Sequence, residues 1–65
     1  MSRPITARRA ANRSVPIGSM TQSPYSGKWV RVIAARHSGS HVELMKVTGE
    51  WFLVDARQPI FRVKS

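Results

Sequence analysis

The segment TARRAANRS, from Thr6 to Ser14, holds three arginines and no acidic residue. If it forms a helix, Arg9 and Arg13 lie four residues apart on one face, with Arg8 beside them. Like charges at this spacing weaken a short helix, and a bound phosphate backbone would remove the repulsion between them. Because arginine-rich segments order in this way on RNA, the segment predicts binding to a polyanion.

The whole chain, like this segment, is strongly positively charged. Eleven Lys and Arg residues stand against three Asp and Glu, which gives a formal net charge of +8. A charge of this density indicates partners rather than a fold, and it favours nucleic acid, acidic protein surfaces and anionic lipid heads. Residues 1–27 carry four of the bases and no acid, whereas residues 28–65 carry the other seven together with all three acids.

Aromatic residues among the bases indicate a second mode of contact. Trp29 and Arg31 share one face of an expected strand, and two further bases share the outward face of the last strand. Aromatic rings interleaved with bases on a β surface stack nucleobases and pair with phosphates. The alternative for Trp29 is a place in the core, since so small a chain usually needs both of its tryptophans inside. The expected nucleic-acid-binding residues are Arg3, Arg8, Arg9, Arg13, Lys28, Trp29, Arg31, Arg62 and Lys64.

The two histidines are the residues that could hold a metal. His37 and His41 form the pattern HSGSH, and Glu43 follows two residues later. Imidazoles at this spacing could clasp a metal ion, with Glu43 as the third ligand. The chain has no cysteine and lacks the helical motif of zinc proteases, so loop histidines that meet phosphate when protonated are favoured instead. No metal and no cofactor is expected.

Catalysis is not expected from this sequence. The carboxylates Glu43, Glu50 and Asp55 fall on different expected strands, so they offer no close pair for acid–base chemistry. The sequence contains neither a Gly-rich phosphate loop nor a nucleophile-elbow pattern. No catalytic residue is therefore assigned.

The length sets limits on the fold. A chain of 65 residues allows one small domain, which buries only about 60% of the surface that its unfolded chain exposes. Without cysteine no disulfide supports it, so the core must come from apolar residues or from a partner. The lack of cysteine suits a reducing compartment such as the cytoplasm. No apolar run approaches the ~20 residues of a membrane span, so no membrane partner is expected.

Residues 1–26 are expected to form a flexible basic arm, disordered or ordered by a partner. Pro4, Pro16 and Pro24 punctuate it, and its apolar residues are too scattered to form a face. Within it, Thr6 is expected to cap a short alanine-rich helix that ends before Pro16. Two other interpretations stay open: a solvated tail that keeps the protein in solution, and an organelle-targeting peptide.

Residues 27–65 are expected to form an all-β unit, a small barrel of four or five short antiparallel strands. Runs of β-branched and apolar residues alternate here with Gly, Ser and Pro. The pattern predicts strands at 28–35, 41–48, 50–55 and 60–65, joined by turns at 36–40, around Gly49 and at 56–59.

Alternation predicts which strand residues face the core. Val30 and Val32 are expected to point inward on the first strand, and Phe61 and Val63 on the last. A fifth strand is expected at 15–20. A helix over the first strand is the competing interpretation, and its β-branched residues disfavour it because they lose rotamer freedom in a helix.

Two stretches carry resemblances to known proteins. The stretch GKWVRVI (27–33), the loop after it and the hairpin around Gly49 resemble the SH3-like barrels, including the KOW-type modules of ribosomal and transcription-elongation proteins. This resemblance covers a little over half of the chain and implies a small, strongly twisted barrel. The stretch TARRAANR (6–13) is similar to the arginine-rich RNA-binding peptides of phage antiterminators, which implies RNA as a partner.

These features predict a nucleic-acid-binding module for RNA or DNA. Low sequence specificity is expected, because only Asn12, Gln22 and Gln58 could read base edges through a side-chain amide. The alternative is a small, phage-encoded factor that docks on a larger protein or ribonucleoprotein assembly, as a regulator of host transcription or a virion component. A barrel edge could also pair with a second copy of the chain. On the first interpretation, removing residues 1–14 weakens nucleic-acid binding and leaves the barrel folded.

Overall fold

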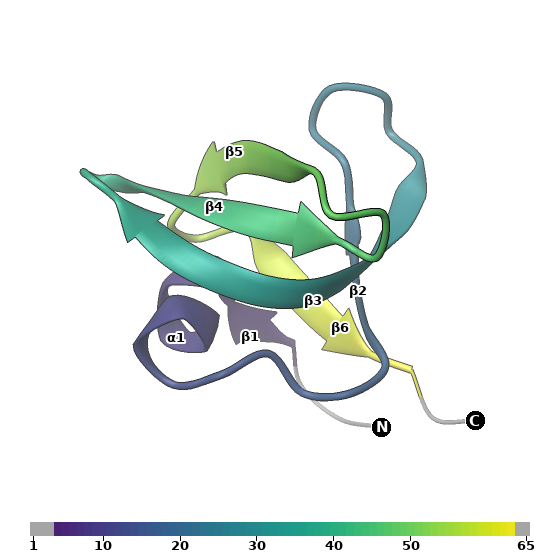
Figure 1. Ribbon diagram of the computed structural model, residues 1–65, viewed down its shortest axis with the longest axis horizontal. Helices are drawn as coiled ribbons and strands as arrows, with labels where there is room; N and C mark the ends of the chain where they lie inside the picture. The colour runs from purple at the N-terminus through teal and green to yellow at the C-terminus, as the bar shows by residue number, and fades with distance from the viewer. Residues whose placement is uncertain (1–3, 64–65) are drawn as a thin grey trace.

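The computed structural model describes residues 4–63, and in this range it contains six strands and one short helix (Figure 1). The elements are β1 (Ile5–Thr6), α1 (Ala7–Asn12), β2 (Ser19–Gln22), β3 (Trp29–Ser38), β4 (His41–Lys46), β5 (Trp51–Asp55) and β6 (Pro59–Arg62). The strands expected at 28–35, 41–48, 50–55 and 60–65 correspond to β3, β4, β5 and β6. The expected all-β class is therefore confirmed.

The strands form one antiparallel sheet in the order β1-β6-β2-β3-β4-β5. Within residues 4–63 no ladder joins β5 to β1, so the sheet ends at these two strands and the closure of a barrel is not seen. The assignment to the SH3-like barrels stays a prediction, because strand content and order do not test membership of a family.

The longest strand, β3, pairs with two partners in turn. Its first part, from Trp29 to Arg31, pairs with β2, and its second part, from Val32 to Ser38, pairs with β4. The register shifts directly after Val32, so Ile33 is the extra residue of a β-bulge. A bulge bends its strand and increases the local twist. Figure 1 shows β3 curving across the full width of the molecule.

The hydrophobic core contains residues from α1 and from four of the strands. On β3, Val30 and Val32 face this core, as expected. Trp29 and Arg31 are exposed on the other side of the strand, which is the alternation that the sequence predicts. The buried apolar residues are Ala7, Ala10, Val32, Val42, Leu44, Val54 and Ile60.

The expected faces of the last strand are wrong. Ile60 is buried, whereas Phe61 is 37% and Val63 54% exposed. Phe61 lies opposite Met20 on the outward face of β2. A pattern of period two divides a strand into two sets of residues but does not say which set faces inward. Ile60 and its partner Ile5 of β1 share the side that packs on the core, so Phe61 faces outward.

The described part of the expected arm, residues 4–26, belongs to the sheet and the core, which corrects the boundary at residue 26. β1 pairs with β6, and β2 lies between β6 and β3. The backbone N–H groups of Ala7 and Arg8 donate to the carbonyl oxygens of Gln58 and Ala56, at 2.8 and 3.0 Å. The sequence prediction failed because this segment buries small and hydroxyl-bearing residues, which do not stand out as an apolar face.

Two of those hydroxyl side chains are buried in β2 with their hydrogen bonds satisfied. Ser19 Oγ donates to the carbonyl oxygen of Pro16 at 2.6 Å, and Thr21 Oγ1 donates to that of Pro59 at 2.7 Å. A buried hydroxyl without a partner costs about 1–3 kcal/mol, so these bonds allow polar residues inside a small core.

The strand expected at 15–20 overlaps β2 only at its last two residues.

The helix α1 begins as its sequence predicts. Thr6 is the N-cap, and its Oγ1 accepts a hydrogen bond from the backbone N–H of Arg9 at 3.2 Å. Ala7 and Ala10 are buried, three residues apart on one face, while Arg8 and Arg9 are exposed. A helix of six residues is too short to be stable alone, so packing of its alanines must stabilise it.

Among the residues that the structure describes, no helix is long and apolar enough to cross a membrane.

The packing of α1 predicts the effect of Ala10→Leu. Ala10 is only 2% exposed, and extra methylene groups in a filled core lower the free energy of unfolding by about 1–3 kcal/mol. The control Arg9→Leu puts the same side chain on the exposed side of the helix, where a change of less than about 0.5 kcal/mol is expected. Urea unfolding measures both variants. Equal stabilities would show that α1 does not pack on the sheet.

Removing residues 1–14 is now expected to destabilise the fold, contrary to the expectation from the sequence. The deletion takes away β1, α1 and two buried alanines of the core. Thermal unfolding of the truncated chain, followed by circular dichroism, measures the effect. A truncated chain with the melting temperature of the full chain would contradict the structure.

Candidate nucleic-acid interface

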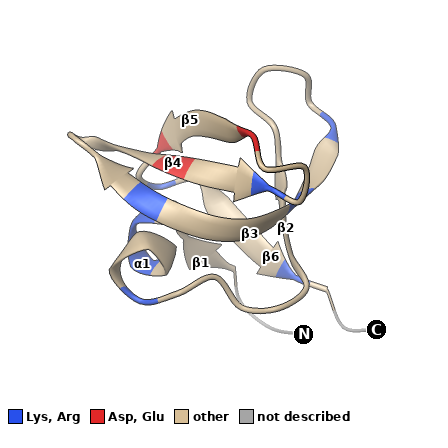
Figure 2. Ribbon diagram, viewed as in Figure 1, with Lys and Arg blue, Asp and Glu red and all other residues tan. Residues whose placement is uncertain are grey.

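The acidic residues are confined to one part of the fold, whereas bases occur throughout it (Figure 2). The three acids lie on the β4–β5 hairpin: Glu43 in β4, Glu50 in the turn and Asp55 at the end of β5. A second part of the described fold carries bases and no acid. It consists of β1, α1, β2, β6, the first part of β3 and the loops between these elements. We call their bases the acid-free set: Arg8, Arg9, Arg13, Lys28, Arg31 and Arg62.

No member of the acid-free set forms an ion pair within residues 4–63. The one ion pair in that range joins Arg36 Nε to Glu43 Oε1 at 2.9 Å, across β3 and β4. The guanidinium carbon of Arg36 also lies 3.9 Å from the ring centre of Trp51. Arg36 is therefore engaged by its own protein, whereas all six bases of the acid-free set are exposed to solvent.

The helix brings three of these bases together. Arg8 and Arg9 lie in α1, and Arg13 is its C-cap, with its N–H donating to the carbonyl oxygen of Arg9 at 3.0 Å. All three side chains are exposed, while the alanines of α1 face the core. The helix therefore presents three positive charges to solvent without a carboxylate to neutralise them.

A second group lies on the outward face of β3, β2 and β6. Met20 is opposite both Arg31 and Phe61, so these three side chains share that face. Trp29 precedes Arg31 by two residues and lies on the same face. The ring centres of Trp29 and Phe61 are 5.5 Å apart, with their planes at 68°. Because Trp29 is 53% exposed, it is a surface residue rather than part of the core.

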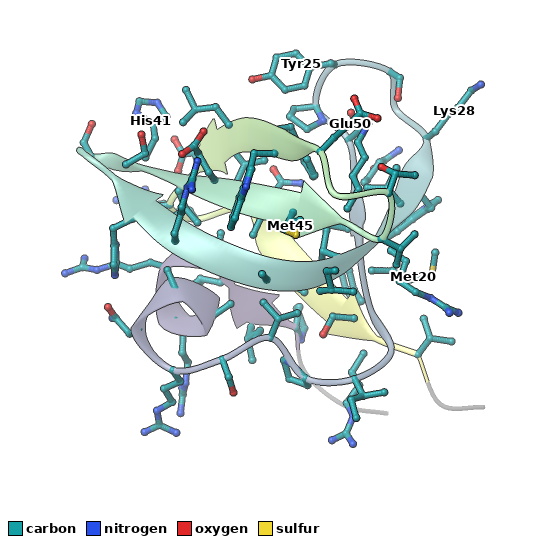
Figure 3. All side chains as sticks on the ribbon, viewed as in Figure 1. Met20, Tyr25, Lys28, His41, Met45 and Glu50 are labelled. Carbon is teal, nitrogen blue, oxygen red and sulfur yellow. The ribbon has the colours of Figure 1, made fainter. Side chains whose placement is uncertain are left out.

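The other predicted site residues are more widely spread. Lys28 directly precedes β3 and extends into solvent (Figure 3). Arg62 lies on β6, next to Phe61 in the sequence and thus on the other face of the strand. Arg3 and Lys64 lie outside the described residues. The structure thus groups the arginines of α1 in one place and the aromatic face in another.

The two histidines lie at the end of the β3–β4 hairpin, and Figure 3 shows His41 at the opposite end of the molecule from Lys28. His37 Nε2 is 2.6 Å from Asn12 Oδ1, which ties the hairpin to α1. Arg8 borders the same shallow hollow as both histidines. In the part of the chain that the structure describes, no group of three or more His, Asp or Glu side chains is placed to hold a metal ion.

Phe61 is the residue of this surface that the sequence prediction missed. Alternation with the charged Arg62 and Lys64 predicts that it faces inward. Its neighbour Ile60 carried the signal that could have found it, because only one of two adjacent strand residues can face inward. An assignment that buries Ile60 places Phe61 on the outward face of the strand.

The chain matches no protein-family model, no curated protein and no solved structure. Its function therefore has to be argued from the chemistry of the residues just described, since a fold by itself does not imply a function.

The separation of charge can be tested without a ligand. A double variant Arg8→Gln/Arg9→Gln and a control Lys46→Gln/Arg57→Gln both lower the net charge of +8 by two. Lys46 ends β4 and Arg57 follows β5, close in sequence to the acids. The first variant is expected to elute from a sulfonate resin at lower salt than the control, because adjacent uncompensated charges act together on a polyanion. Equal elution would show that the positive field is evenly spread.

Proposed function

We propose that this protein binds nucleic acid, RNA or DNA, with low sequence specificity. The observation that supports the proposal is the acid-free set, six exposed bases on elements that carry no carboxylate. Each base that meets a phosphate releases a counterion from the nucleic acid, and this release drives sequence-independent binding. If all six bases contact phosphate on a duplex, the slope of log K against log salt is about −5.

Low specificity follows if the arginines contact phosphates, because few side-chain amides then remain to read bases. Reading a base edge in a groove usually takes a paired contact from Arg, Asn or Gln. Asn12 is already bonded to His37. The amide nitrogens of Gln22 and Gln58 donate within the protein, so neither glutamine can make a paired contact through both of its amide atoms. Contacts to the phosphate backbone would therefore dominate, and these carry no sequence information.

The lack of cysteine suits the reducing cytoplasm, and we place this binding there, in a host cell if the chain is phage-encoded.

A protein-docking role is the second candidate, and one apolar surface favours it. Ile17, Ile33 and Val47 are exposed and border a hollow of about 310 Å³, with Arg31 also in its lining. Exposed apolar side chains grouped in this way are typical of interaction sites. On this interpretation the protein docks on a larger protein or ribonucleoprotein assembly, such as the transcription machinery or a virion, or on a second copy of itself.

Titration of labelled RNA and DNA at several salt concentrations tests the proposal. We expect Kd below about 10⁻⁴ M at low salt and a steep loss of affinity as salt rises. A Kd weaker than this value for every nucleic acid would refute the proposal and favour protein docking.

The same pair of double variants locates the contact. Arg8→Gln/Arg9→Gln is expected to make the salt slope less steep by about 2, because two phosphate contacts are lost. Lys46→Gln/Arg57→Gln keeps the acid-free set and is expected to leave the slope unchanged. If both variants change the slope equally, binding responds to net charge alone and α1 is not the contact.

A further inference from the structure

A shallow pocket lies beside the exposed aromatic pair. It has a volume of about 510 Å³ and is bordered by Trp29, Phe61, Gln22, Gln58, Pro24 and Pro59. We propose that this pocket takes one unpaired nucleobase of a single-stranded nucleic acid, stacked on Trp29. The inference rests on the proposed function and adds to it a binding site on the protein and a class of ligand, single-stranded nucleic acid.

The exposure of the aromatic rings is the first support. A chain with so small a core gains stability by burying a tryptophan, yet Trp29 is 53% exposed. Phe61 meets it at an angle of 68°, so the two rings form adjoining walls of the pocket. A flat base can stack on one ring while its edge contacts the other. Base–aromatic stacking of this kind tolerates any sequence, because every base has a π face.

Two side-chain amides supply hydrogen-bond acceptors at the same pocket. The Nε2 of Gln22 donates to the carbonyl oxygen of Gly27 at 2.9 Å, and the Nε2 of Gln58 donates to that of Gln22 at 2.7 Å. A carbonyl oxygen only accepts, so in each amide the nitrogen must be the atom that faces it. The Oε1 atoms then lie on the other branch of each amide, where they can accept an N–H from the edge of a base.

The charges around the pocket favour a nucleotide over an apolar peptide. Lys28 directly precedes Trp29 and extends into solvent (Figure 3), and Arg31 follows on the same outward face. The elements that border the pocket carry no acidic residue. A ligand with an aromatic plane and a negative backbone is complementary to this surface, and a single strand offers both.

Fluorescence of Trp29 reports on the pocket directly. The chain has two tryptophans, so a Trp51→Phe variant leaves Trp29 as the only one. We titrate this variant with oligothymidylate, whose base donates through N3–H, and with an abasic deoxyribose-phosphate chain of the same length. We expect oligothymidylate to change the emission of Trp29 and to bind about 5- to 100-fold more tightly than the abasic chain, the range that stacking of one base gives.

The outcomes separate the two proposals. If neither chain binds, and duplex DNA and RNA do not bind either, the proposed function fails. If both chains bind equally and the emission of Trp29 does not change, nucleic-acid binding stands and the base pocket is wrong. Preference for a duplex over the single strand would also overturn the pocket.

Substitution of Trp29 gives a second measurement that does not depend on fluorescence. Trp29→Phe keeps an aromatic plane and is expected to retain most of the affinity for oligothymidylate. Trp29→Leu keeps an apolar side chain without the plane and is expected to lose about 5- to 100-fold, with no change for the abasic chain. The matched control Trp51→Leu removes the other tryptophan and should bind as the wild type does, provided that unfolding experiments show it folded. A Trp29→Leu variant with wild-type affinity would overturn the pocket.

Discussion

The bend in β3 is the constraint on which the rest of the structure depends. One strand serves two ladders, with β2 and with β4, and the extra residue Ile33 lets it turn from one to the other. Before the bulge, Trp29 and Arg31 stand on an outward face shared with β2 and β6, where no acid is present. After the bulge, Arg36 stands opposite Glu43 and pairs with it. The bend thus divides the bases of β3 between the proposed nucleic-acid interface and an ion pair with Glu43.

This division has an energetic side. Exposed like charges without partners repel each other and oppose the compact state, and a fold of this size has little stability in reserve. A polyanion that binds the folded state would relieve the repulsion and stabilise the protein by mass action. The charges act over roughly 8 Å at physiological salt, whereas the aromatic pocket acts only in contact. On the proposed function, the two features suit successive stages of binding, first capture of a phosphate backbone and then stacking of a base.

Much of the local structure could be predicted from the sequence. The cap at Thr6, the strand beginning near Trp29 and the turn at Gly49 each depend on residues close together in the chain. Gly49 has a φ of 94°, a conformation that favours glycine, and its N–H donates to Lys46 in the turn. Alternation also placed Trp29 and Val30 on opposite faces. The exposure of Arg8 and Arg9 on α1 follows from helical spacing, which is also a local property.

The sequence by itself determined the net charge, the lack of cysteine, the strand-forming runs and the start of the helix. Only the tertiary structure decided that β1 and β2 complete the sheet, that α1 packs on the core, and that Phe61 faces outward beside Trp29. Each of these depends on contacts between residues far apart in the chain, such as Ile5 with Ile60. Small buried residues like Ala10 give no signal of their own, because their burial depends on which side chains lie across from them.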